Sequence, residues 1–410
     1  RLQQKTVTGI TSEALSLLGT FYAVQFLHLN ARCLERLAVD LAESPDRLRP
    51  YSLFLQNSER DFVGLTSAYV RRALRLVLPS EVKSRYVLCS VGTRGHQDDI
   101  DVAAIDEGGP DRSALDRAFA RLTTEMLRHA SALDHYIAAR VGTKSLCLSL
   151  EELSRTLASG GLDFVAVSEL LRAERLTGSR RLYARLQDEI VSQYLYHPAG
   201  DNSLHECYLR RLLGEIRSLL LFPPATGILH PKDDALRVIS SLATAYKTIE
   251  ALPQTSMREI LASLSEQRRA LGPLLKRLED SSIFLETFRH LAHLLLAQEE
   301  GIEISDSGLR ENLLQVAAAM GYRDHRAVQA VDHMLVHYEE AVEAARETAL
   351  PLMEEVARHL AGISAFSSWA GGRIGEPPAE NLAEQIAARA AEFRGARFWD
   401  DPLEALGAPD

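Results

Sequence analysis

Two aspartates placed two positions apart are the residues of this sequence best suited to chemistry. Asp99 and Asp101 follow a glycine turn in the stretch from Ser90 to Val102. Residues two apart on a strand point to the same face, so the two carboxylates can hold one cation together. Mg²⁺ prefers carboxylate oxygens together with phosphate oxygens, and two such ions can hold the attacking and leaving oxygens of a displacement. The pattern therefore favours magnesium-dependent chemistry on a phosphate.

The turn before the aspartates has the features of a phosphate-binding loop. Gly92 lets the backbone approach a phosphate, and amides exposed at a turn form a concave anion site. A hydroxyl residue, Thr93, and a basic residue, Arg94, follow it. Such patterns also occur by chance, and Asp98 and Asp99 are equally suited to an ordinary turn. The local pattern alone leaves both interpretations open.

The elements that position these residues can be predicted along the chain. The apolar, β-favouring run from Tyr86 to Val91 ends at Gly92, which predicts a buried strand followed by a turn. The elements expected next are a hairpin partner at 99–105, a helix at 113–130, a strand at 136–141, a helix starting at Ser149 and a strand at 162–166. Glu151 and Glu152 in the first turn of that last helix suit the helix dipole.

Helices are expected on both sides of this unit. Residues 11–44 and 51–78 carry apolar side chains three or four positions apart, which is typical of amphipathic helices, and Pro79 ends the second. Nearly everything from Ser168 to 368 is expected to be helical. The predicted fold class is α+β and mostly helical. We expect an N-terminal helical segment at 1–80, a small mixed-sheet domain at 81–178, a helical bundle at 179–368, and a tail at 369–410 with one helix at 380–393.

Composition and charge exclude several classes of protein. The net charge of the 410-residue chain is -10, whereas a general nucleic-acid binder needs many cations to neutralise phosphates. The most apolar N-terminal stretch, from Leu15 to Leu29, is too short and too polar to span a bilayer, so no membrane partner is expected. Four scattered cysteines fit a reducing cytoplasm. Because the chain starts at Arg1, we expect it to be a piece of a longer protein.

Several motifs from about residue 84 to 350 occur in an order that resembles a known family, the protein-PII uridylyltransferases. The family belongs to the DNA polymerase beta-type nucleotidyltransferases. Residues 149–178 resemble its helix, carboxylate-bearing strand and Leu-x-Gly ending, and 231–237 resemble its Lys…Gly-Leu-Arg motif in the closer spacing of relatives that accompany cyclic-nucleotide and CBS domains. Residues 288–299 and 320–338 resemble the helices that follow the catalytic domain.

The resemblance implies a function and a set of site residues. The family transfers a nucleoside monophosphate from a triphosphate, here UTP or ATP, to a tyrosine of a signalling protein. By resemblance, Gly92, Thr93 and Arg94 would hold the triphosphate, and Asp99 and Asp101 would bind Mg²⁺. Asp163 would be the third metal-side carboxylate and would help to polarise the attacking hydroxyl. Lys232 and Arg237 would face the nucleotide or the acceptor from the helical domain. We therefore expect the three aspartates to converge on adjacent strands, opposite Lys232.

The sequence departs from the family pattern in ways that support a second interpretation. From Gly92 to Asp99 is only seven positions, fewer than the family usually has, and His96 stands where an acid is expected. Arg172 and Glu174 reverse an expected pair of charges. Asp234 and Ala235 stand where the family has glycines, and acids beside a triphosphate would repel it. The alternative is therefore a catalytically degenerate nucleotidyltransferase fold that acts as a nucleotide sensor or a protein-interaction module.

Overall fold

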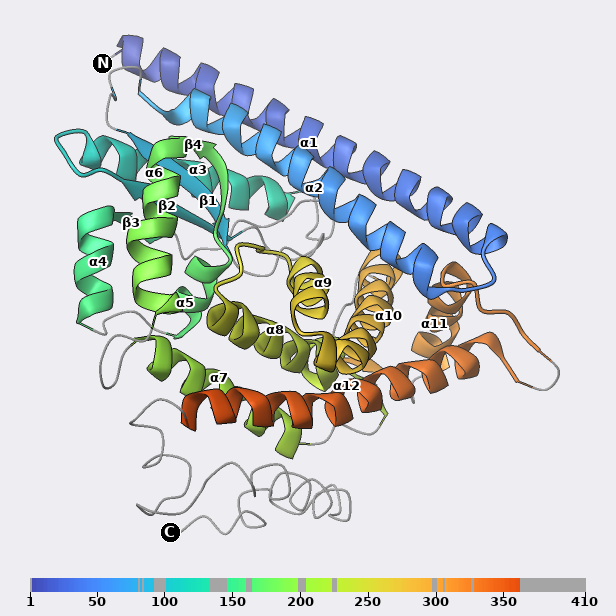
Figure 1. The fold of residues 1–410 in the computed structure, drawn as a ribbon. Coiled ribbons are helices and arrows are strands. Elements are labelled where there is room, and N and C mark those ends of the chain that lie inside the picture. The colour runs from blue at the N-terminus through green and yellow to red at the C-terminus, as the bar shows by residue number, and fades with distance from the viewer. Residues whose placement is uncertain are drawn as a thin grey trace, which may run out of the picture.

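A long helical hairpin and a helical bundle pack around a small mixed sheet in the computed structural model of the chain (Figure 1). The structure describes residues 2–79, 82, 85–91, 101–132, 146–159, 164–197, 204–222, 227–296, 301–304, 307–325 and 328–361. The fold is α+β and mostly helical, as the sequence predicts.

The N-terminal hairpin consists of two long helices, α1 (Leu2–Glu43) and α2 (Leu48–Val77), which lie side by side along one edge of the molecule (Figure 1). The side chains of Tyr22 and Tyr69 stack between them, with ring centroids 4.5 Å apart. After α2 the backbone becomes extended at Leu78, which the following proline requires. The predicted helices at 11–44 and 51–78 are therefore confirmed.

Four strands form the central sheet, and their order is β3-β2-β1-β4. They are β1 (Tyr86–Val91), β2 (Asp101–Asp106), β3 (Leu146–Ser149) and β4 (Glu174–Gly178). β1 is antiparallel to both β2 and β4, which confirms the predicted hairpin, and β2 is parallel to β3. The connection from β2 to β3 contains α3 (Arg112–Ala132). A helical crossover is the usual way to join two parallel strands.

The two faces of the sheet contribute to two different cores, because alternate residues of a strand point to opposite faces. Val87, Cys89 and Ile105 belong to the large core shared with the helical bundle. Leu88 and Ala104 belong to a second core shared with α1, α2 and α3. Helices therefore cover both faces of the sheet. The β1–β2 hairpin lies between the helical bundle on one face and α1, α2 and α3 on the other.

The remaining elements are mostly helices. They are α4 (Leu150–Ala158), α5 (Phe164–Leu171), α6 (Arg180–Arg185) with a π-helical continuation (Leu186–Tyr196), α7 (Leu204–Leu221), a π-helical turn (Lys232–Leu236), α8 (Arg237–Glu250), α9 (Met257–Gln267), a 3₁₀ turn (Arg269–Leu271), α10 (Gly272–Leu296), α11 (Ser307–Ala319) and α12 (Ala330–Ala361). Two short strands, β5 (Ile228–Leu229) and β6 (Ile302–Glu303), pair antiparallel. Helix α12 packs against α7, α8 and α10, so it closes the bundle.

Two elements differ from the sequence prediction. The strand predicted at 162–166 is wrong for its described part, because helix α5 begins at Phe164 and the Ser168 hydroxyl donates to the Phe164 carbonyl (2.9 Å). Conversely, β4 lies in a stretch predicted to be helical. It ends at Gly178, whose φ is 93°, and a Cβ there would lie 2.3 Å from the Tyr86 carbonyl oxygen. Only glycine tolerates both that dihedral and that approach. The strand predicted at 136–141 and the helix at 380–393 lie outside the described residues.

Candidate functional site

The segment that carries Gly92 and Asp99 connects β1 to β2. Val91, the last residue of β1, pairs with Asp101, the first residue of β2. Residues 92–100 connect this pair, and Gly92, Thr93, Arg94 and Asp99 within them lie outside the described residues. The described register therefore fixes where the segment leaves and re-enters the sheet. Both points lie at the same end of the hairpin.

The alternation of β2 relates Asp101 to the helical bundle. Position 101 precedes Ala103 and Ile105 by two and four residues, so it belongs to the same face of the strand. Ala103 and Ile105 are buried in the core that the sheet shares with the bundle. The bundle also carries Lys232 and Arg237. Residue 101 therefore shares its face of the strand with Ala103 and Ile105, and the side chain of Asp101 lies outside the described part of the structure.

Asp163 lies outside the described residues, between α4 and α5. The strand beside β2 is β3, whose residues Leu146–Ser149 include no acid, so the described neighbour of β2 supplies no third carboxylate. Among the described side chains, no three His, Cys, Asp or Glu are grouped closely enough to hold a metal ion. Within the predicted set, oxygen donors suited to Mg²⁺ come from Asp99, Asp101 and Asp163 alone.

The turn that carries Lys232 is held by ion pairs. Lys232 is exposed at the first position of the π-helical turn. The Arg237 guanidinium donates to the carboxylate of Asp233 (3.0 Å) and to that of Glu215 on α7 (3.3 Å). These contacts raise the pKa of Arg237, the hydrogen bond to Asp233 most of all. The charge of Arg237 is therefore already compensated, whereas Lys232 presents its charge to solvent.

Asp234 points into the bundle and away from Lys232. Its Oδ2 accepts from the Tyr338 hydroxyl on α12 (2.6 Å) and from the backbone amide of His230 (2.9 Å). Arg346 donates to the Asp234 backbone carbonyl (3.1 Å). Burial raises the pKa of the Asp234 carboxyl. The sequence suggests two acids that repel a triphosphate, but only Asp233 is exposed beside Lys232. The Asp234 carboxylate instead connects the turn before α8 to α12 through its hydrogen bond with Tyr338.

Arg172, one member of the apparent charge reversal, joins the sheet to the bundle. It follows α5 and is buried, and its Nη2 donates to the Ser240 carbonyl (3.1 Å), the Ser240 hydroxyl (2.6 Å) and the Thr244 hydroxyl (2.5 Å) on α8. Burial lowers the pKa of the guanidinium. Sequence reasoning missed this contact, because Ser240 and Thr244 lie 68 and 72 positions away and nothing in their spacing indicates a partner.

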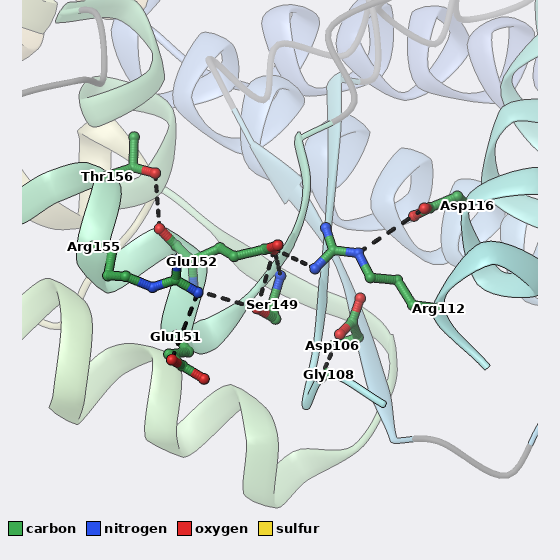
Figure 2. Close-up of polar contacts among 9 residues, drawn as sticks. All are labelled: Asp106, Gly108, Arg112, Asp116, Ser149, Glu151, Glu152, Arg155 and Thr156. Atoms are coloured by element: carbon green, nitrogen blue, oxygen red, sulfur yellow. Dashed lines mark hydrogen bonds and ion pairs between the residues drawn. The ribbon is translucent and has the colours of Figure 1, made fainter. Parts of the chain in front are cut away.

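A polar network at the opposite end of β2 fixes the neighbouring strands and helices (Figure 2). Arg112, at the start of α3, donates to the Glu152 carboxylate on α4. Glu152 also accepts from the Ser149 amide (3.0 Å), and the Ser149 hydroxyl accepts from the Glu152 amide (3.2 Å), which completes a capping box. Asp106, which is buried, accepts from the Gly108 amide (2.5 Å).

These contacts have an electrostatic consequence. The Ser149 amide and then Arg112 lower the pKa of Glu152, and the bond to Glu152 raises the pKa of Arg112. Ser149 is also the register partner of Asp106. The network therefore ties α3 and α4 to the paired ends of β2 and β3, and it supports the hairpin from the end opposite the glycine turn.

Comparison with models of known protein families finds no match, and comparison with curated proteins finds none either. The resemblance to the uridylyltransferases therefore stays an expectation from the order of the sequence motifs. In the described part of the chain, every helix is too short or too polar to cross a membrane.

Proposed function

We propose that the chain is a magnesium-dependent nucleotidyltransferase-like protein that transfers a nucleoside monophosphate from UTP or ATP to a protein acceptor. The observation that carries this proposal is the pairing of Val91 with Asp101. This pairing supports the proposal because the segment 92–100 joins these two residues, on a sheet that packs against a bundle with an exposed lysine. This arrangement is suited to holding a triphosphate between a turn and a cation.

In this proposal each residue has a role that its chemistry allows. Gly92, Thr93 and Arg94 bind the phosphates through backbone amides, a hydroxyl and a positive charge. Asp99 and Asp101 hold Mg²⁺, with Asp163 as the third carboxylate, and the ion neutralises charge on the phosphate oxygens. Asp163 also orients the acceptor hydroxyl, while Lys232 draws the nucleotide or the acceptor to the hairpin. Such chemistry depends mainly on positioning and charge neutralisation.

The structure of the Lys232 turn modifies the role of Arg237. Since Arg237 is engaged by Asp233 and Glu215, we assign it to holding the turn that carries Lys232. Direct contact of Arg237 with a phosphate would require both ion pairs to open. Exposed ion pairs are weak, each about 0.2–1 kcal/mol, so opening both would cost little.

Titration calorimetry on the full chain tests the proposal. UTP, ATP, GTP and CTP are titrated with and without Mg²⁺, and we expect magnesium-dependent binding of UTP or ATP. Asp99→Asn and Asp101→Asn should each abolish it. Asp98→Asn is the matched control, because it removes the same charge from the same segment but lies outside the D-x-D pair, and it should bind normally. Loss of binding in all three variants alike, or no binding by the wild type, rejects the assignment.

A second function, a nucleotide sensor or interaction module without turnover, is favoured by one group of observations. The strand beside β2 brings no acid, Asp234 serves the bundle, and Arg237 is held in ion pairs. Incubation with UTP or ATP labelled at the α-phosphate, in the presence of an extract from the source cells, separates the two. Label on a protein band supports the transferase. Tight magnesium-dependent binding without label on any protein supports the sensor.

A further inference from the structure

One long stretch of α1 is free of charge although it lies on the outside of the molecule. Residues 14–31 contain no Asp, Glu, Lys or Arg. Figure 1 shows α1 as the outermost helix, with α2 between it and most of the chain. The solvent-facing side of a surface helix normally carries charged and polar residues. The inner side is covered, since Leu15, Tyr22 and Phe26 are buried in the core with α2.

The outer side of this stretch carries several exposed apolar side chains, next to the exposed Ser16, Thr20 and His28. Leu17 is 67% exposed, Phe21 60% and Val24 44%. Phe21 also borders a groove of about 380 Å³ between α1 and α2, where Leu18 and Leu65 are among the lining residues. Exposed apolar side chains that gather on one face of a helix often mark an interface.

The spacing of this surface is symmetrical along the helix. We define the α1 stripe as six exposed residues, which are Glu13, Leu17, Phe21, Val24, His28 and Arg32. They follow one another at steps of four, four, three, four and four, so they lie along one face. This series of steps is the same in either direction. An antiparallel copy of the helix would therefore present its stripe in matching register.

The charges at the two ends of the α1 stripe are complementary under the same symmetry. Glu13 precedes Phe21 by eight positions, and Arg32 follows Val24 by eight. A two-fold axis between Phe21 and Val24 thus sets Glu13 of one chain opposite Arg32 of a second copy, and the reverse. Closed two-fold interfaces need this self-complementarity. The apolar centre of the α1 stripe is flanked by two opposite-charge pairs, and Arg71, Arg72 and Arg75 of α2 line the groove beside Phe21.

We propose that the chain forms a two-fold homodimer through the α1 stripe, with the two α1 helices antiparallel. The uncharged stretch of 18 residues is about 27 Å long at 1.5 Å per residue. A contact of this length along one helix is small beside a standard interface of roughly 800 Å² per partner, so the α1 stripe alone makes a weak interface. We therefore expect dissociation at concentrations on the order of micromolar. The proposal is independent of the nucleotidyltransferase assignment.

Analytical ultracentrifugation of the full chain over a concentration series tests the dimer. The wild type should sediment with twice the chain mass of 45.4 kDa and dissociate on dilution. Phe21→Glu should be a monomer throughout, because the substitution places two carboxylates near the axis. Val336→Glu is the matched control, since Val336 on α12 is 51% exposed and lies outside the stripe. It should remain dimeric, and both variants should retain the wild-type circular dichroism.

A charge exchange tests the register and excludes simple misfolding. Glu13→Lys creates two like-charge contacts per dimer, so we expect the dissociation constant of the dimer to rise about tenfold. Adding Arg32→Glu to the same chain restores opposite charges at both ends and should return the wild-type affinity. A wild-type chain that stays monomeric up to about 100 µM overturns the proposal. A dimer that persists in Phe21→Glu, or an exchange variant no tighter than Glu13→Lys, overturns it as well.

Discussion

The hydrogen bond between Tyr338 and Asp234 can be tested as the contact that fixes the turn carrying Lys232 to α12. Tyr338→Phe removes the hydroxyl that donates to the Asp234 carboxylate and leaves the hydrogen bond from the His230 amide in place. Asp234 is only 4% exposed, so water cannot readily replace the lost bond. A hydrogen bond to a charged group contributes about 1.5–3 kcal/mol. We expect the free energy of unfolding to fall by about 2 kcal/mol.

A larger loss is expected when the acceptor itself is removed. Asp234→Ala removes the acceptor of both the Tyr338 hydroxyl and the His230 amide, and the loss of each hydrogen bond to a charged group costs about 1.5–3 kcal/mol. The sum is about 4 kcal/mol. The effects should not add, because both substitutions break the same contact. In the Asp234→Ala/Tyr338→Phe double variant we expect a coupling energy of about 1–2 kcal/mol.

Urea unfolding followed by circular dichroism measures these free energies. Tyr194→Phe is the matched control, because the Tyr194 hydroxyl bonds to the neutral hydroxyl of Ser154 (2.8 Å) and its loss should cost about 1 kcal/mol or less. The account is contradicted if Tyr338→Phe lowers the free energy of unfolding no more than Tyr194→Phe and the double-variant cycle gives no coupling energy. Asp234 would then not hold α12. The acid would then be available to face Lys232 and to repel a triphosphate.

Two further predictions concern buried histidines and a glycine. Burial lowers the pKa of His205 and of His359, whose rings lie 5.8 Å apart, so the native state favours their neutral forms. The stability they contribute is present above the unfolded pKa of about 6.5 and lost as pH falls below it. His205→Asn/His359→Asn should lose less stability than the wild type between pH 7.5 and 5.5 in urea titrations, and an equal loss would contradict the assignment. Gly178→Ala forces a Cβ against a carbonyl and should cost more than about 2 kcal/mol. The helical control Gly214→Ala, with open space around it, should stabilise the chain by about 0.5–1 kcal/mol, and similar effects of the two would refute this account.

The sequence predicts the elements whose side chains repeat at the period of their own structure. The spacing of Phe62, Leu65 and Tyr69 gives α2, and the unbroken apolar run from Tyr86 gives β1. The run at 162–166 does not decide between helix and strand, because a short apolar segment fits both. In β4 only Leu176 is buried, so an edge strand with polar neighbours carries no alternating pattern.

The contacts that hold the candidate site together are beyond sequence reasoning for a different reason. Asp234 meets Tyr338 across 104 positions, and Arg172 meets Ser240 across 68. Each is an ordinary polar residue on a helix, and only the packing of the bundle turns it inward. The residue types of the D-x-D pair and the glycine turn are visible locally, which is why the chemistry could be proposed. How Lys232 and Arg237 are held could not be predicted.

The proposal that Asp99 and Asp101 hold a divalent ion against a triphosphate is tested most directly by anomalous diffraction. Crystals of the full chain grown with Mn²⁺ in place of Mg²⁺, together with UTP or ATP, would locate the ion without reference to activity. We predict an anomalous peak within about 2.0–2.3 Å of carboxylate oxygens of both aspartates, beside the phosphates and the turn that begins at Gly92. Nucleotide bound elsewhere, or bound at this turn with no anomalous peak near either carboxylate, would contradict the account.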